Sequence, residues 1–293
     1  MAGQIQTKNI KVGIIGGTGL ENSNLLDSNY TEHDIDTPYG KPSAPLIEGI
    51  LNGVPCVLLV RHGKKHDISP TNVNYRANLW AMKKLGVNVI LATNASGSLN
   101  EEIRPGSFVF FDDYIDRTNK RQTTFYDGFV GHPHGVCHIP MYPAFSESLR
   151  KILAESAQDL GFEYHKKGII ICIEGPHYSS RAESNAYQLL NASIINMTIC
   201  PEVMLAKELG MLYAGVALVT DYDCWKDNDK HVSVDLVAQT MVVNSEKSIK
   251  LFVRAIEKIK ESSALLLDDI RAAKIVARNS VMIDPKEVLE HLL

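Results

Sequence analysis

Short apolar segments with strand character alternate along this chain with segments of helical periodicity. This alternation constrains the fold, because strands that alternate with helices form a sheet whose faces the helices cover. We therefore expect the α/β class, with an αβα sandwich. The expected strands are 11–17, 46–51, 54–60, 87–92, 107–111, 168–173 and 212–219, and the expected helices are 75–85, 146–160, 181–190, 201–209, 233–261 and 265–277.

The organisation of the chain favours a single domain over residues 1–293. This length can bury a full core, and no internal repeat, low-complexity segment or linker divides it. Residues 1–9 form a polar N-terminal segment, and residues 264–293 form a helical tail. Asn52-Gly53 predicts a tight hairpin between two strands. Residues 118–143 are rich in Gly, His, Pro and Tyr and are expected to form a long surface loop of functional importance.

The composition disfavours several classes of function. Net charge is −4 and Lys and Arg are scattered, so no basic face for nucleic acid is expected. No apolar stretch reaches membrane-spanning length, and the polar start of the chain predicts no signal peptide. The five cysteines form no Cys-x-x-Cys pair, which favours a reducing, cytoplasmic compartment.

Two acids, Asp221 and Asp223, follow the apolar run 214–219. Residues two apart in extended chain point to the same face, so the two carboxyl groups can converge on one ligand. Burial can hold neighbouring carboxyls in different protonation states, one donating a proton and one accepting a hydrogen bond. An adenine-like ring needs that pairing. The alternative is a turn in which Asp223 caps the next segment.

Polar, glycine-marked segments also follow other expected strands. Ligands of open α/β sheets gather at the carboxyl edge of the strands, so these segments are candidate parts of one site. Each taken alone is equally compatible with a helix cap. The segments are 92–98, 173–181 and 196–202.

Two segments have the character of a phosphate site. Gly16-Gly17-Thr18-Gly19 follows the first strand and offers closely spaced N–H groups beside a hydroxyl. Asn22 stands where a dinucleotide fingerprint has its third glycine, which disfavours a nicotinamide cofactor. Arg61-His62 ends a hairpin strand and offers a fork of donors beside a group that can carry a proton. A plain glycine turn and a surface arginine paired with a carboxylate are the alternatives.

One cluster of residues has a metal-like composition. His132, His134, Cys137 and His138 lie close in sequence, but Pro133 and two glycines interrupt them. No second cluster accompanies them, so the usual zinc spacings are not met and no metal is expected. We interpret this segment as a loop with one histidine facing a ligand.

Together and in this order, the motifs resemble the trimeric purine nucleoside phosphorylase family, in its branch that acts on 5'-methylthioadenosine. The resemblance covers residues 11–240. It implies a mixed, partly barrel-like twisted sheet, a homotrimer, and cleavage of 5'-methylthioadenosine by phosphate, without a cofactor or a metal, in purine and methionine salvage. The matching segments are Gly16-Gly17-Thr18-Gly19, Arg61-His62-Gly63, Ala95-Ser96-Gly97-Ser98, residues 174–184, Asn196-Met197-Thr198 and residues 220–225.

The resemblance also implies a role for each site residue. Asp221 and Asp223 are the catalytic pair. Val234 and Val237 would line the 5' pocket, which His138 and Met282 would close from a neighbouring subunit. The phosphate-binding residues would be Thr18, Arg61, His62, Asn94, Ala95 and Thr198, and the nucleoside-binding residues Tyr178, Ser179, Met197, Thr220, Asp221, Asp223, Val234, Val237, His138 and Met282.

The chain departs from the family pattern in three places. Asn94 stands where a threonine hydroxyl is expected on the phosphate, and Tyr178 replaces a phenylalanine beside the base. The C-terminal tail matches poorly. These departures bear on the affinity for phosphate and on what the tail contributes to the pocket.

Three other functions are weighed against this one. A 6-oxopurine nucleoside phosphorylase would have an amide at position 221 and a polar group at position 234, where this chain has Asp221 and Val234. A nicotinamide-dependent dehydrogenase is disfavoured by Asn22. A non-catalytic nucleoside sensor would keep the base pocket but would not need Arg61 and Thr198 to converge on phosphate.

Overall fold

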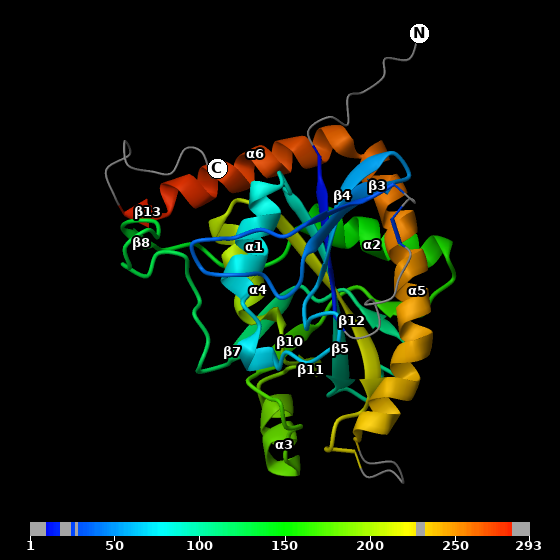
Figure 1. Cartoon of the computed structure of the whole chain (residues 1–293). Coiled ribbons are helices and arrows are strands. Elements are labelled where there is room, and N and C mark those ends of the chain that lie inside the picture. Colours follow the sequence, from blue (N-terminus) through cyan, green and yellow to red (C-terminus); the bar gives the residue numbers. More distant parts are fainter. Residues whose placement is uncertain (1–9, 18–24, 27–28, 227–231, 283–293) are drawn as a thin grey trace.

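The computed structural model describes residues 10–17, 25–26, 29–226 and 232–282 (Figure 1). The polar segment 1–9, Thr18 and residues 283–293 lie outside the described residues. The helices are α1 Tyr75–Lys84, α2 Glu147–Asp159, α3 Arg181–Leu189, α4 Ile199–Glu208, α5 Val234–Glu261 and α6 Ser263–Asn279. The strands are β1 Val12–Gly16, β2 Thr31–His33, β3 Leu46–Leu51, β4 Val54–Val60, β5 Val89–Ser98, β6 Phe108–Val109, β7 Asp113–Arg117, β8 Val136–Cys137, β9 Tyr164–His165, β10 Ile169–Ile173, β11 Ile194–Asn196, β12 Leu212–Asp221 and β13 Val281–Met282.

The main sheet is mixed and branched, with 11 strands. Its path runs β2-β3-β4-β1-β5-β11-β10-β7. β1 is parallel to β4 and β5, whereas β11 is antiparallel to β5. The branch lies at β5, because β12 also pairs with it in parallel along most of its length and leads on to β6 and β9. The mixed sheet confirms the predicted α/β class.

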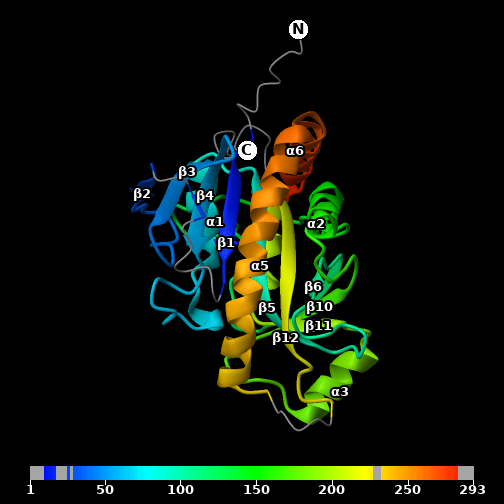
Figure 2. The same ribbon diagram turned by 90° about the vertical axis from the view of Figure 1, so that its right-hand side faces the viewer.

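Helices cover both faces of the sheet, as the predicted αβα sandwich requires (Figure 2). Successive residues of β12 point to opposite faces. Tyr213 and Ala217 belong to a core that includes α1 and α4, whereas Ala214 and Val216 belong to a second core with α2, α5 and α6. A strand buried on both sides needs apolar residues at nearly every position, which explains the continuous apolar run. None of the helices in the described ranges has the length and apolarity to cross a bilayer.

The predicted hairpin and the six predicted helices are confirmed, most bounds within two residues. Leu51 pairs with Val54 across the hairpin, and both turn residues have positive φ, 52° at Asn52 and 78° at Gly53. Asn-Gly tolerates that conformation at both positions. The longest helix begins as expected, with Ser233 Oγ accepting from the N–H of Leu236 at 3.2 Å.

The predicted end of the strand over 87–92 is wrong. β5 continues through the polar residues to Ser98, since β12 pairs with it as far as Gly97 and β11 pairs with its last two residues. The apolar run therefore ends at residue 92, whereas the strand continues to residue 98. Six further strands of two to five residues were not predicted either, and most of them pair with strands far away in the chain. They are β2, β7, β8, β9, β11 and β13.

The long loop and the tail come together in a small second sheet. Residues 118–143 are irregular as predicted, except that β8 pairs antiparallel with β13, Cys137 opposite Val281. The expected helical tail over 264–293 therefore includes a short strand after α6. The loop is fixed to α4 by Glu208, which accepts from the N–H of Phe125 at 2.8 Å. Burial raises the pKa of Glu208 to about 7.

Candidate active site

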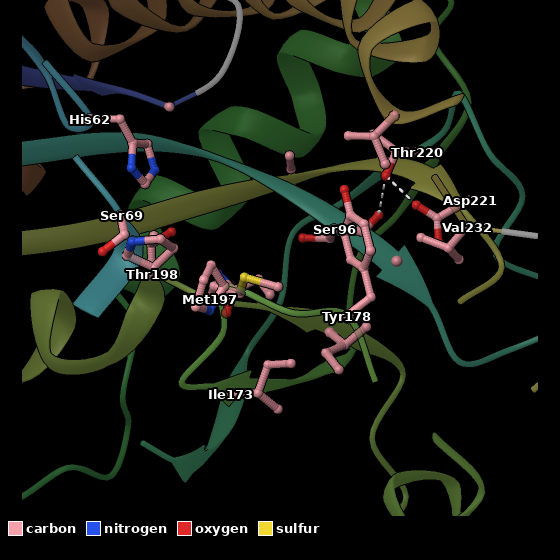
Figure 3. A pocket seen from close by; sticks show the side chains of 18 of the residues that line it. His62, Ser69, Ser96, Ile173, Tyr178, Met197, Thr198, Thr220, Asp221 and Val232 are labelled. Atoms are coloured by element: carbon pink, nitrogen blue, oxygen red, sulfur yellow. Dashed lines mark hydrogen bonds between the residues drawn. The ribbon is translucent and has the colours of Figure 1, made fainter. Parts of the chain in front are cut away.

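A cavity of ≈ 450 Å³ lies where β1, β4, β10, β11 and β12 end, and the second half of β5 runs along it (Figure 3). Most residues predicted for the site line it. Figure 3 places His62 and Thr198 toward one end and Asp221 with Val232 toward the other. The predicted residues in the lining are Arg61, His62, Ala95, Tyr178, Ser179, Met197, Thr198, Thr220, Asp221, Asp223 and Val237.

The two acids converge, but not in the way the sequence predicts. Asp221 is the last residue of β12, whereas Asp223 lies in a turn with φ of 51°. The backbone N–H of Asp223 donates to Asp221 Oδ1 at 2.7 Å, and Thr220 Oγ1 donates to Asp221 Oδ2 at 2.6 Å. A left-handed turn, and not extended chain, therefore brings the second carboxyl to the first. The two acids are each 6% exposed.

Burial sets the protonation of this pair. It raises the pKa of Asp221, and the hydrogen bonds from Thr220 and from the Asp223 N–H only partly oppose it. Burial also raises the pKa of Asp223, with a further rise from the charge of Asp221. Burial thus shifts both carboxyl groups toward the protonated form, the form that can donate a proton.

Arg61 is held at the opposite end of the cavity by a buried ion pair that the sequence does not predict. Its side chain is 1% exposed and that of Glu202 is 0% exposed. Nε and Nη2 donate to the two carboxylate oxygens of Glu202 at 2.7 and 2.8 Å, and Nη1 donates to Thr93 O at 3.0 Å. Tyr213 also donates to Glu202. The alternative of a surface arginine is therefore wrong.

Gly17, directly after β1, passes close to this arginine. A Cβ at Gly17 would stand 3.0 Å from Arg61 Nη1 and 3.2 Å from Thr93 O. The close approach brings the backbone of Gly17 beside the guanidinium. Thr18, predicted on the phosphate, lies outside the described residues.

Asn94, predicted to bind phosphate, contacts the cavity lining through Thr198. Its Nδ2 donates to Thr198 Oγ1 at 3.1 Å, and its side chain stands behind the lining. Because the threonine oxygen accepts this bond, the hydroxyl hydrogen of Thr198 is turned elsewhere. His62 Nδ1 lies 2.8 Å from Ile68 O, which fixes the ring at the cavity wall. A carbonyl only accepts, so Nδ1 carries the hydrogen.

The structure differs from the predicted 5' pocket. Val237 lines the cavity, but Val234 is 72% exposed and does not. Val234 is the first residue of α5. Val232, just before the helix, lies in the lining in its place. The resemblance to the family was the basis for placing Val234 beside Val237, and it did not indicate the residue that precedes the helix.

His138 and Met282 do not line the cavity of their own chain. They lie together on the small sheet, where Met282 pairs with Val136 and the N–H of His138 donates to Ser280 O at 2.8 Å. Figure 1 shows β8 and β13 far from the end of β12. Met282 is 70% exposed. The two residues predicted to act on a neighbour thus belong to the same small region of the surface.

Other lining residues were missed by the sequence reasoning. The loop after Arg61 contributes a continuous wall that includes Ser69 and Pro70. Nothing in its sequence marks a site. Glu202 gives only the weak signal of an acid in the first turn of a helix, which usually means a favourable helix dipole.

The metal-like cluster serves other contacts. His132 Nδ1 lies 2.7 Å from Asp127 Oδ1, and its Nε2 lies 3.0 Å from Pro38 O. Within the described part of the chain, no three His, Cys, Asp or Glu side chains gather as a metal would require.

Comparisons with known proteins show the family to which the chain is similar. The model of the phosphorylase superfamily matches residues 11–257. The S-methyl-5'-thioadenosine phosphorylase of Caenorhabditis briggsae is 50% identical over 97% of this chain and 98% of its own length. That of Drosophila melanogaster is 50% identical over 93% of both. The structure of the methylthioadenosine phosphorylase of Schistosoma mansoni in complex with adenine is 39% identical, with a TM-score of 0.89 over 93% of this chain and 99% of that one.

A second solved structure supports the same relationship. A mutant of the adenosine/methylthioadenosine phosphorylase of Schistosoma mansoni, in complex with methylthioadenosine, is 39% identical and superposes with a TM-score of 0.87. The superposition covers 93% of this chain and 99% of the solved chain. The chain belongs to the phosphorylase superfamily and, within it, to the family of the S-methyl-5'-thioadenosine phosphorylases.

Proposed function

We propose that this protein cleaves 5'-methylthioadenosine with inorganic phosphate, giving adenine and 5-methylthioribose 1-phosphate, a step of purine and methionine salvage. The observation that carries the proposal is one cavity with buried acids at one end and a held arginine with a threonine hydroxyl at the other. The known relatives support the choice of substrate. No cofactor and no metal enter this proposal, since phosphate is the second substrate.

Asp221 would act at the leaving base. Adenine leaves poorly as an anion, so its N7 needs a proton or a strong hydrogen bond as the glycosidic bond breaks. Burial raises the pKa of Asp221 and so shifts this carboxyl toward the protonated form that a general acid needs. Thr220 and the N–H of Asp223 hold the carboxyl in one orientation. Asp223 would face the 6-amino group, and Tyr178 with Ser179 the rest of the base.

Phosphate would bind at the other end and attack the ribose. Positive charge develops on the sugar in the transition state, and a dianion fixed beneath it both stabilises that charge and forms the new bond. Arg61, His62, Ala95, Thr198 and Thr18 would hold the dianion. Met197 lies between the two ends in Figure 3, where it would pack on the ribose.

The direct test is release of adenine from 5'-methylthioadenosine, followed by absorbance with and without phosphate. The proposal expects release only with phosphate. A 6-oxopurine analogue with the same sugar should be disfavoured by up to ~10⁴-fold, because it would set an acceptor against an acceptor. Equal turnover of both bases would favour the 6-oxopurine phosphorylase, and nucleoside binding without turnover would favour the sensor.

We further propose a homotrimer in the cytoplasm in which His138 and Met282 close the 5' pocket of a neighbouring subunit. Their common place on the β8–β13 sheet, away from their own cavity, supports this role. Sedimentation would test the trimer. A Met282→Asp variant that stays trimeric should lose affinity for the methylthio substrate.

Val237 is predicted to select the 5' substituent. A methylthio group needs an apolar wall without unpaired donors. Val237→Thr keeps the volume and adds a hydroxyl, so the ratio of kcat/KM for adenosine to that for methylthioadenosine should rise by ~10-fold. Val234→Thr is the matched control, because that side chain is exposed, and should change the ratio less than ~2-fold. If the ratio rose in Val234→Thr and not in Val237→Thr, Val234 and not Val237 would line the 5' pocket.

Asn94 is predicted to act on phosphate through Thr198. Asn94→Ala removes one neutral hydrogen bond, of about 0.5–1.5 kcal/mol, so the phosphate KM should rise several-fold while the nucleoside KM holds. Asn244 is the matched control, being buried with its Nδ2 donating to Val219 O at 3.0 Å outside the lining. Asn244→Ala should leave the phosphate KM unchanged. A phosphate KM unaffected in Asn94→Ala would contradict the role.

A further inference from the structure

Arg121 lies in the long loop after β7, outside the cavity lining, yet it is almost fully enclosed. Its side chain is 1% exposed. A guanidinium has five N–H donors and no acceptor, so burying it requires a matching set of acceptors. Besides the hydroxyl of Tyr75 at 3.3 Å, the acceptors around Arg121 come mainly from two segments that form walls of the active site.

The first set of acceptors follows β11. Nη1 of Arg121 donates to Met197 O at 2.7 Å and to Cys200 O at 2.6 Å. Met197 and Thr198 line the cavity, at the place proposed for the ribose and the phosphate. Cys200 has non-helical φ and ψ inside α4, so its carbonyl accepts from the arginine instead of following the regular helix pattern.

The second set of acceptors follows β10. Nη2 donates to Glu174 O at 2.9 Å, and Nε donates to Glu174 Oε1 at 3.0 Å. Glu174 opens the segment that carries Tyr178 and Ser179 along the base. The two walls also touch directly, since a Cβ at Gly175 would meet Met197 Sδ at 2.4 Å.

The carboxylate of Glu174 joins a third wall to these two. It accepts from Thr71 Oγ1 at 2.6 Å and from the N–H of Asn119 at 2.8 Å. Thr71 directly follows Ser69 and Pro70 of the lining. Burial alone would raise the pKa of Glu174, but the bonds from Thr71, the Asn119 N–H and Arg121 outweigh it and lower the pKa to about 2.

We propose that Arg121 is a positioning residue for the phosphorolysis, which with Glu174 fixes the ribose and phosphate wall relative to the base wall. The inference rests on the proposed function. Attack requires phosphate, ribose carbon and leaving base in line, and a displacement of about 1 Å can cost ~10²-fold in rate. Loss of the clamp should therefore lower kcat more than it weakens binding.

The test compares two buried arginines that differ in what they hold. Arg150 is 5% exposed and donates to Phe111 O at 2.9 Å and to Phe110 O at 3.0 Å, and it pairs with Glu147. None of these partners lines the cavity. Lysine at either position keeps the charge but loses the fork of donors. Arg150→Lys thus reports the cost of disturbing a buried arginine as such.

Turnover of 5'-methylthioadenosine is measured per adenine-binding site, with the sites counted by calorimetric titration. Arg121→Lys should lose ~10-fold or more in kcat per site, with both KM values changed less, whereas Arg150→Lys should keep the wild-type kcat per site. Thr71→Val, which removes one bond to Glu174, should lose several-fold in the same direction. If Arg121→Lys does not fold, Thr71→Val and Glu174→Gln decide.

The positioning role would be overturned if Arg121→Lys, Thr71→Val and Glu174→Gln kept the wild-type kcat per site. It would also be overturned if Arg150→Lys lost as much kcat per site as Arg121→Lys. Failure of the proposed function looks different, because wild-type protein would then release no adenine in phosphate. In that case the role assigned to Arg121 falls with it.

Discussion

Replacing Asp221 with asparagine is expected to lower kcat for methylthioadenosine by ~10²-fold or more, the usual contribution of a general acid. Asparagine keeps the size of the side chain and still donates a hydrogen bond, but it has no proton to transfer. The carboxyl is buried, with a raised pKa and two fixed hydrogen bonds, so it is placed to serve as that acid. Near-normal turnover in the variant would mean that another group protonates the base.

Asp221→Asn should leave the fold intact. Measurements at several pH values separate its effect on stability from its effect on turnover. A carboxyl whose pKa is raised on folding contributes stability below its unfolded pKa, and that contribution is lost as pH rises through the folded pKa. Above that value Asp221→Asn should therefore melt at the wild-type temperature or higher. In wild type, kcat should fall as pH rises through the pKa of Asp221, and the variant should lack that descending limb.

Replacing Arg61 with alanine is expected to have the largest effect on stability. It would leave the carboxylate of Glu202 buried and without its ion pair, which costs about 3–5 kcal/mol of unfolding free energy. The phosphate KM should also rise strongly, because a charged donor is lost. Chemical denaturation and phosphate titration measure the two effects separately.

A double replacement distinguishes the two roles of this arginine. Arg61→Met with Glu202→Leu removes both charges and restores apolar packing, so much of the stability should return while phosphate binding stays weak. If phosphate binding recovers together with stability, Arg61 supports the fold only. If nucleoside binding without phosphate is lost as well, the arginine does not belong to the phosphate end.

The fold was predictable where the pattern is local. Asn52-Gly53 fixes a hairpin through its own φ preferences, and Ser233 starts a helix through its own hydroxyl. The end of β5 is different. Residues 93–98 are polar and look like a loop, but β11 and β12 pair with them from distant parts of the chain.

The site was predictable as a set of residues and less so as a geometry. Asp221 and Asp223 were paired by assuming extended chain, whereas the turn at Asp223 is what joins them. Val234 was placed by the resemblance to the family, although the residue before the helix, Val232, is the one in the cavity lining. The resemblance to the family predicted which residues belong to the site. It could not predict the exposure of each side chain, because exposure depends on tertiary packing.

Buried partners were the part that the sequence could not supply. Arg61 and Glu202 are far apart in the chain, and so are Arg121 and the carbonyls it binds. No periodicity in the sequence marks such pairs. A charged side chain needs a partner only once folding has buried it away from water.

The most direct test of phosphorolysis is to follow phosphate itself. Purified protein is mixed with equal amounts of methylthioadenosine and inorganic phosphate, and the reaction is followed by phosphorus NMR while adenine is quantified by chromatography. We expect a sugar 1-phosphate signal to grow in one-to-one proportion with adenine as the inorganic phosphate signal falls. Adenine formed while inorganic phosphate stays constant would show hydrolysis, and would contradict phosphate as the nucleophile.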